Sequence, residues 1–158
     1  MTNVKKSSEK RKPSESDSES FSEQERAAIK ERAAELKAAG RRGSGSKKAA
    51  DERDVVTTIA EMPQPDRGLA ERVHAIITAV ASNLSPKLWY GQPAYAKDGQ
   101  VVCFFRSAEK DETRYSTFGF SDQANLDAGG MWPTAYALTE LRAADEAAVG
   151  ALVKKAAS

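Results

Sequence analysis

The residues with the greatest capacity for chemistry in this chain are its only histidine, His74, and its only cysteine, Cys103. A catalytic histidine needs a nucleophile or an orienting carboxylate close by, and its neighbours in the sequence offer only Glu71 and Thr78. Cys103 lies in an apolar segment, where a thiol behaves as a small buried hydrophobe and not as a nucleophile. One cysteine and one histidine are also too few ligands for a zinc or iron–sulfur site within one chain. We therefore predict no catalytic residue and no metal ligand at these positions.

Two groups of carboxylates could in principle bind a hard cation, because such ions prefer oxygen ligands. The groups are Asp51, Glu52 and Asp54 in the first half of the chain, and Glu109, Asp111 and Glu112 in the second. Basic residues interrupt both of them, Arg53 in the first group and Lys110 in the second. Mixed charge of this kind is typical of a solvated surface. We interpret both groups as surface and predict no metal site.

Aromatic residues are concentrated between Trp89 and Trp132 and indicate where a ligand could bind. Rings that flank turns and strand ends can form an apolar pocket, in which a few polar side chains orient a small ligand. The candidate ligand-binding residues are Trp89, Tyr90, Gln92, Pro93, Tyr95, Arg106 and Trp132. The alternative is that these rings fill a small hydrophobic core and hold their polar atoms at its rim.

The elements that position these residues are helices in the first half of the chain and strands in the second. Apolar residues at helical spacing predict one helix over Asp51–Met62 and another from an N-cap at Asp66 to Leu84. A last helix is expected over Ala143–Ala156. Strands are expected over residues 88–90, 94–97, 101–106, 114–120 and 134–139.

The turns between these strands predict how they pair. Gly91–Pro93 predicts a bend, and Asp98–Gly99 is a strong signal for a two-residue hairpin turn. Val101–Arg106 is apolar on both faces, which is typical of a central strand. The sequence therefore predicts an α+β fold with an antiparallel sheet of about four to five strands packed by helices.

The first 48 residues form a separate region of the predicted chain. Residues 1–20 are a polar tail of mixed charge that we expect to be disordered. Residues 21–48 predict an accessory helix, which begins at a Ser22–Glu25 capping box, and a basic flexible linker. Only Ile29 and Leu36 are large and apolar in this helix, so we expect it to rest lightly on the domain or on a partner. Residues 49–158 form the domain.

Composition limits the classes of protein to which the chain can belong. The formal net charge of +1 gives no general attraction to nucleic acid or to an anionic membrane. No apolar segment approaches the ~20 residues that span a bilayer. The N-terminus has no apolar segment of the kind found in secretory signals, and the single cysteine cannot form an internal disulfide. These features predict a cytoplasmic protein.

Three segments of the second half resemble a known family. The segments WYGQPAYAKDGQVVCFF, TFGF and MWPTAYALTEL are similar to the YdhG-like domain family, a bacterial group largely of unknown function. The resemblance covers about residues 51–156 and implies a small α+β domain with an antiparallel sheet. One relative is described as a frataxin-like intracellular iron chaperone. The resemblance therefore implies iron as the candidate cofactor, by analogy alone. Shorter family members often carry a histidine in the strand after the central one, whereas the segment Thr113–Phe120 has none.

Three functional interpretations follow from these observations. The first is a small cytoplasmic binding module without catalytic machinery, whose small-molecule ligand or partner peptide binds near an aromatic cleft. The second, by family analogy alone, is iron binding through exposed carboxylates. The third is contact with nucleic acid through the basic part of the tail and the linker Arg41–Lys48.

Overall fold

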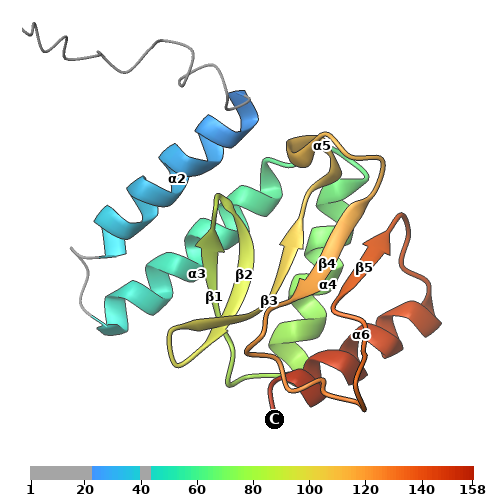
Figure 1. Cartoon of the computed structure of the whole chain (residues 1–158). Coiled ribbons are helices and arrows are strands. Elements are labelled where there is room, and N and C mark those ends of the chain that lie inside the picture. The colour runs from blue at the N-terminus through green and yellow to red at the C-terminus, as the bar shows by residue number, and fades with distance from the viewer. Residues whose placement is uncertain (1–22, 40–43) are drawn as a thin grey trace, which may run out of the picture.

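The computed structural model describes residues 23–39 and 44–158 and has the predicted α+β fold (Figure 1). The predicted disordered tail, residues 1–20, lies outside the described residues, as do Ser22 of the capping box and residues 40–43. The helices are α2 (Glu23–Ala39), α3 (Ser44–Ala60), α4 (Asp66–Val80), α5 (Ala108–Asp111) and α6 (Ala143–Ala156). The strands are β1 (Ser85–Trp89), β2 (Gln92–Lys97), β3 (Gln100–Arg106), β4 (Ser116–Phe120) and β5 (Ala135–Leu138). Among the described residues, no helix has the length and apolar character needed to cross a membrane.

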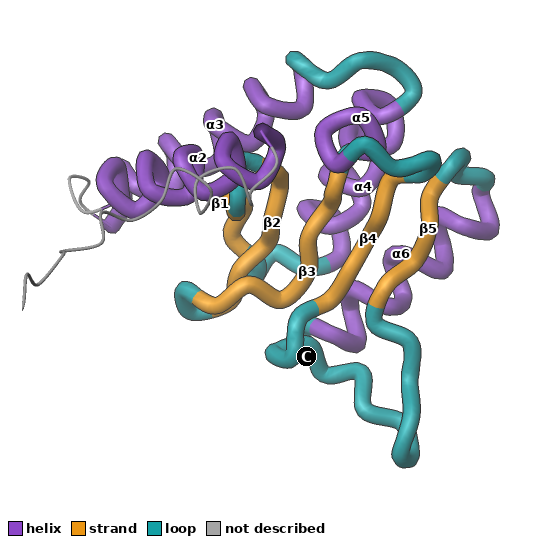
Figure 2. Tube along the Cα trace, turned by 45° about the horizontal axis from the view of Figure 1, so that its top comes forward, coloured by secondary structure: helices purple, strands orange, loops and turns teal. Residues whose placement is uncertain are grey.

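The five strands form one antiparallel sheet in the order β1-β2-β3-β4-β5, so each strand pairs with its neighbours in sequence (Figure 2). β3 lies at the centre, as its apolar sequence predicted. Two-residue turns join β1 to β2 at Tyr90–Gly91 and β2 to β3 at Asp98–Gly99, and all four residues have positive φ. This conformation matches the twist of the paired strands. It also explains why glycine occupies positions 91 and 99, because glycine adopts positive φ without strain.

Helices α4 and α6 cover one face of the sheet, and α3 lies along β1 and β2 (Figures 1 and 2). The core between the sheet and these helices is apolar. Its fully buried side chains include Val55, Val73, Ile77, Tyr95, Phe105, Phe118 and Val153. α2 lies outside this core, next to β1 (Figure 1).

The structure corrects three details of the predicted helices. α3 begins at Ser44, so residues 44–48 of the predicted flexible linker are helical. Burial of Val55 and Ile59 anchors this helix, and tertiary packing of an apolar face outweighs the low helix propensity of its first turn. The N-cap of α4 is Pro65 and not Asp66, and the helix ends at Val80 before the buried Leu84.

Two strand details also differ from the prediction. The residues from Gln92 onwards belong to β2, so Pro93 is part of a strand and not of a bend. Pro93 pairs with Leu88 of β1, while the pairing of β2 with β3 begins only at Ala94. The missing N–H of proline therefore does not interrupt the ladder to β3. The polar segment after β3 contains the short helix α5, which the sequence pattern does not indicate.

Candidate functional site

The turn between β1 and β2 presents a backbone donor to another part of the chain. Tyr90 has φ 52° and Gly91 has φ 74°, and the pair Trp89–Gln92 closes the hairpin. The N–H of Gly91 donates a hydrogen bond of 2.7 Å to Oε1 of Glu35 in α2. A carboxylate that accepts from a backbone N–H makes a charge-assisted bond, which is stronger than a neutral one.

Helix α5 places an ammonium group beside the same turn. Lys110 Nζ donates to the carbonyl oxygen of Gly91 at 3.1 Å and to Oε2 of Glu31 at 2.5 Å. The helix is fixed at its start because Ser107 Oγ accepts from the backbone N–H of Lys110 at 3.3 Å. We refer to Tyr90, Gly91 and Lys110 together as the hairpin corner.

A buried carboxylate holds α5 in position from the inside. Asp66 is only 4% exposed. Its Oδ2 accepts from Ser107 Oγ at 2.7 Å and from the backbone N–H of Glu109 at 3.0 Å. Its Oδ1 accepts from Ser116 Oγ at 3.2 Å. Because a buried carboxylate is tolerated only when it is hydrogen-bonded, these contacts tie α4 to α5 and β4.

Gln92, Arg106 and Asp111 form a hydrogen-bonded network next to the hairpin corner. Gln92 Nε2 donates to Asp111 Oδ1 at 2.9 Å, and Gln92 Oε1 accepts from the backbone N–H of Ser107 at 2.5 Å. Arg106 donates to both oxygens of Asp111, through Nε at 2.6 Å and Nη2 at 3.1 Å. The Gln92 side chain is buried and serves to hold β2 to the start of α5. Arg106 keeps three of its five N–H donors outside these two bonds.

Helix α2 lies over the hairpin corner and is held mainly by charged side chains. The carboxylates of Glu31 and Glu35 supply two contacts of this helix. Arg32 supplies a third, because its guanidinium carbon lies 5.7 Å from the centroid of the Tyr90 ring. The two large aliphatic side chains of α2 are more than half exposed, Ile29 at 54% and Leu36 at 58%. This agrees with the expectation of a helix that rests lightly on the domain.

Two cavities lie beside α2 and share Gln92 and Lys110 as lining residues. The larger has a volume of about 590 Å³ and lies between α2, α3 and the β1–β2 hairpin. The smaller has a volume of about 310 Å³ and lies between α2, α5 and the end of β3. Ala34, Met62 and Leu88 also line the larger cavity, together with four glutamates, Glu31, Glu35, Glu61 and Glu109. The lining of the smaller cavity includes Gln24, Glu25, Ala28, Tyr90, Arg106 and Asp111.

Four of the seven predicted ligand-binding residues lie together. Tyr90, Gln92 and Arg106 border the smaller cavity. Trp89 adjoins them, with its ring centroid 5.2 Å from that of Tyr90 and 5.3 Å from that of Phe104. These rings extend from the hairpin corner onto the sheet.

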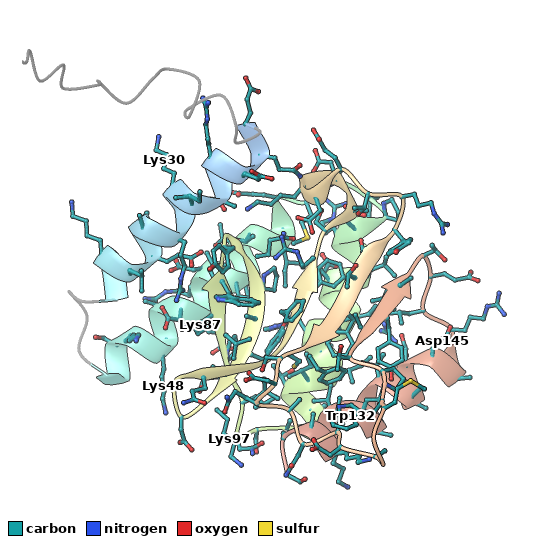
Figure 3. All side chains as sticks on the ribbon, in the orientation of Figure 1. Lys30, Lys48, Lys87, Lys97, Trp132 and Asp145 are labelled. Carbon is teal, nitrogen blue, oxygen red and sulfur yellow. The ribbon has the colours of Figure 1, made fainter. Side chains whose placement is uncertain are left out.

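The other three predicted residues lie elsewhere. Pro93 and Tyr95 are fully buried, and they point to the opposite face of β2 from Gln92 because side chains alternate along a strand. Trp132 packs against the core near α6, at the end of the sheet away from α5 (Figure 3). The structure does not bring all seven residues into one aromatic cleft.

The histidine and the cysteine are both engaged in the fold. His74 Nδ1 lies 2.9 Å from the hydroxyl of Tyr95. Burial lowers the pKa of His74, although the nearby carboxylate of Glu52 partly opposes the shift. Cys103 is completely buried, and burial raises the pKa of its thiol to about 12. Neither side chain borders the two cavities.

The two predicted surface carboxylate groups do not converge on a common point. Asp111 of the second group is held by Arg106 and Gln92. Within residues 23–39 and 44–158, no group of three or more histidine, cysteine, aspartate or glutamate side chains is arranged to hold a metal ion.

Sequence reasoning does not identify Lys110 or Asp66 as residues of the site. Gly91 has a recognisable signal, because glycine between two extended segments indicates a turn. Lys110 lies in a segment of mixed charge that looks like ordinary surface. It acquires its role only because α5 packs beside a turn 19 residues away in the sequence.

Comparison with protein-family models, with curated proteins and with solved structures finds no match for this chain. Its function must therefore be argued from the hairpin corner and the adjoining cavities. They combine a backbone N–H, an ammonium group and an aromatic ring on one surface. Such a combination suits a ligand with a carboxylate or phosphate group and an apolar part.

Proposed function

We propose that this chain is a binding module, related to the YdhG-like domains that its strand segments resemble, and that it binds an anionic ligand at the hairpin corner. The observation that carries the proposal is that the Gly91 N–H and the Lys110 ammonium each hold a carboxylate of α2. A surface with the donors to bind two carboxylates of its own chain has the donors to bind those of a ligand.

The size of the cavities and the apolar part of their lining support this proposal. Their volumes of about 590 and 310 Å³ fall within or near the range of known ligand sites, roughly 300–1,000 Å³. Met62 and Leu88 give the larger cavity an apolar wall, while Tyr90 and Arg106 border the smaller. An anionic group held by Lys110 could extend an apolar part into either cavity.

Binding is a better interpretation than catalysis for this surface. Its lining residues include no histidine or cysteine, and the carboxylate of Asp111 is held in a bidentate pair with Arg106. A general base needs a side chain free to take a proton from a substrate. At the corner, the Gly91 N–H and the Lys110 ammonium act as hydrogen-bond donors to carboxylates, which suits the binding of an anion.

The proposal can be tested by thermal unfolding of the full-length chain with citrate, with ATP and with a short glutamate-rich peptide. We expect at least one of these anions to raise the melting temperature, and Lys110→Met to abolish the rise. Lys154→Met removes an exposed lysine of α6 and should leave the response unchanged. An equal response in both variants, or no response to any anion, would contradict the proposal.

A further inference from the structure

We infer that the hairpin corner recognises an acidic helix of a partner protein, and that α2 is a tethered occupant which such a helix displaces. This inference rests on the proposed function and specifies its ligand. The recognised feature is a pair of carboxylates one helical turn apart. In this chain Glu31 and Glu35 supply that pair.

The geometry of the pair explains why a helix suits the site. Residues four apart in an α-helix lie on the same face, about one turn from each other. Glu35 reaches the Gly91 N–H at 2.7 Å, and Glu31 reaches Lys110 Nζ at 2.5 Å. The two donors are themselves fixed, because Lys110 also binds the Gly91 carbonyl oxygen at 3.1 Å. The hairpin corner therefore favours two carboxylates at this spacing over carboxylates at other spacings.

Glycine at position 91 is a requirement of this recognition. A Cβ atom there would overlap the Glu31 carboxylate and the Lys110 ammonium. Gly99, in the equivalent turn between β2 and β3, also has positive φ, but a Cβ there would meet no atom within 4 Å. Turn conformation alone accounts for Gly99, whereas Gly91 also lets two charged side chains approach closely.

Several features of α2 indicate that it occupies the surface incompletely. Its large aliphatic side chains, Ile29 and Leu36, are exposed, and Lys30 also points away from the sheet (Figure 3). Gln24 Nε2 is buried, and within the described part of the chain it has no hydrogen-bond partner. A buried donor without an acceptor weakens the contact. A helix attached in this way can be replaced by one that fits better.

The cavities show what a better-fitting helix would carry. Ala28 and Ala34 are the α2 residues whose small side chains border the smaller and the larger cavity respectively. A partner helix with the same two carboxylates and larger apolar side chains at these two positions would fill space that α2 leaves open. The larger cavity offers Met62 and Leu88 as contacts.

The test uses the full-length chain with Glu31→Gln and Glu35→Gln, which removes both carboxylates of the tethered helix. Fluorescent peptides with the sequence of residues 23–39 are titrated against it. The first has the natural sequence, the second carries Glu31→Gln and Glu35→Gln, and the third carries Ala28→Leu and Ala34→Leu. We expect the natural peptide to bind, and the peptide without the carboxylates to bind at least tenfold more weakly. The peptide with larger side chains should bind about tenfold more tightly than the natural one, because it buries more apolar surface.

The controls separate this inference from the proposed function. Adding Lys110→Met to the chain should reduce the difference between the first two peptides, because only the Gly91 N–H is then left to bind a carboxylate, and Lys154→Met should not. If small anions stabilise the chain but the natural peptide and its carboxylate-free variant bind equally, the inference is wrong and the proposed function stands. If neither anions nor peptides respond to Lys110→Met, both are wrong. If the wild-type chain forms dimers by exchanging α2, the occupant of the corner is a second copy of this chain. That result would overturn the inference that the occupant is a helix of a different protein.

Discussion

Gly91 is the residue on which most of the site depends. Its N–H and its carbonyl oxygen both bind charged side chains, and its φ of 74° lies in the region that glycine adopts without strain. Glycine at this position therefore meets two separate requirements. The first is the positive φ of the hairpin turn, and the second is the space for the side chains that hold α2. These requirements can be distinguished experimentally because Gly99 shares only the first of them.

Gly91→Ala and Gly99→Ala should each lower the free energy of unfolding by roughly 1–3 kcal/mol, because alanine is strained at positive φ. Only Gly91→Ala should also release α2, since its Cβ would overlap the Glu31–Lys110 contact. Urea unfolding measures the first effect, and hydrogen exchange of the α2 amides measures the second. Equal protection of α2 in the two variants would contradict the contacts described for Gly91.

His74 should make the stability of the fold dependent on pH. Burial lowers the pKa of His74 below its ordinary value of 6.5, so between these two values the unfolded chain binds more protons than the folded chain. The contribution of neutral His74 is therefore complete above pH 6.5 and is lost as the pH falls towards the folded pKa. Urea unfolding from pH 8 to pH 5 should show a steeper loss of stability for the wild type than for His74→Gln. An identical pH dependence of the two proteins would show that His74 does not titrate in this way.

Among the elements, α2 differs from the others in how it is held. The remaining long helices bury apolar side chains such as Val55, Val73 and Val153, whereas α2 relies on charged contacts. Lys110 is 29% exposed and its partner Glu31 is 42% exposed, so water screens their attraction. Pairs of this kind contribute about 0–1 kcal/mol. The domain should therefore stay folded when α2 detaches.

The variant with Glu31→Gln and Glu35→Gln should show this independence directly. Its free energy of unfolding should fall by roughly 1–3 kcal/mol, since an exposed ion pair and a charge-assisted hydrogen bond to the Gly91 N–H are weakened. Its α2 amides should exchange nearly as fast as those of an isolated helix, because short helices are marginal without tertiary contacts. Glu140→Gln, which breaks the exposed pair with Arg142 on the other side of the domain, is the matched control. Cooperative unfolding of the whole domain in the double variant would contradict the independence of α2.

The elements that sequence reasoning predicted well are those with strong local signals. Asp98–Gly99 indicated its hairpin, and the apolar stretch Val101–Arg106 indicated the central strand. The start of α3 could not be found in this way, because serine and glycine are poor helix formers and the packing of Val55 decides the outcome. The helix α5 depends on a buried hydrogen bond between Ser107 and Asp66, 41 residues apart.

At the scale of the whole molecule, the candidate site was only partly predictable. Trp89 and Tyr90 mark the correct turn, since aromatic residues beside a glycine at a strand end suggest a surface site. Tyr95 could have been separated from them by strand alternation, whereas the distant position of Trp132 follows from a loop that local sequence does not specify. Lys110 and the carboxylates of α2 come together only in the folded chain, so no local sequence pattern predicts their contact.

The most direct test of the account is an amide-resolved NMR titration of the full-length chain that carries Glu31→Gln and Glu35→Gln. The added peptide has the natural sequence of residues 23–39. We predict saturable shifts of the Gly91 amide and of its neighbours Tyr90 and Gln92, with no change at Gly99 in the other hairpin turn. An unchanged Gly91 signal, or equal shifts at Gly91 and Gly99, would contradict a carboxylate-binding site at the hairpin corner.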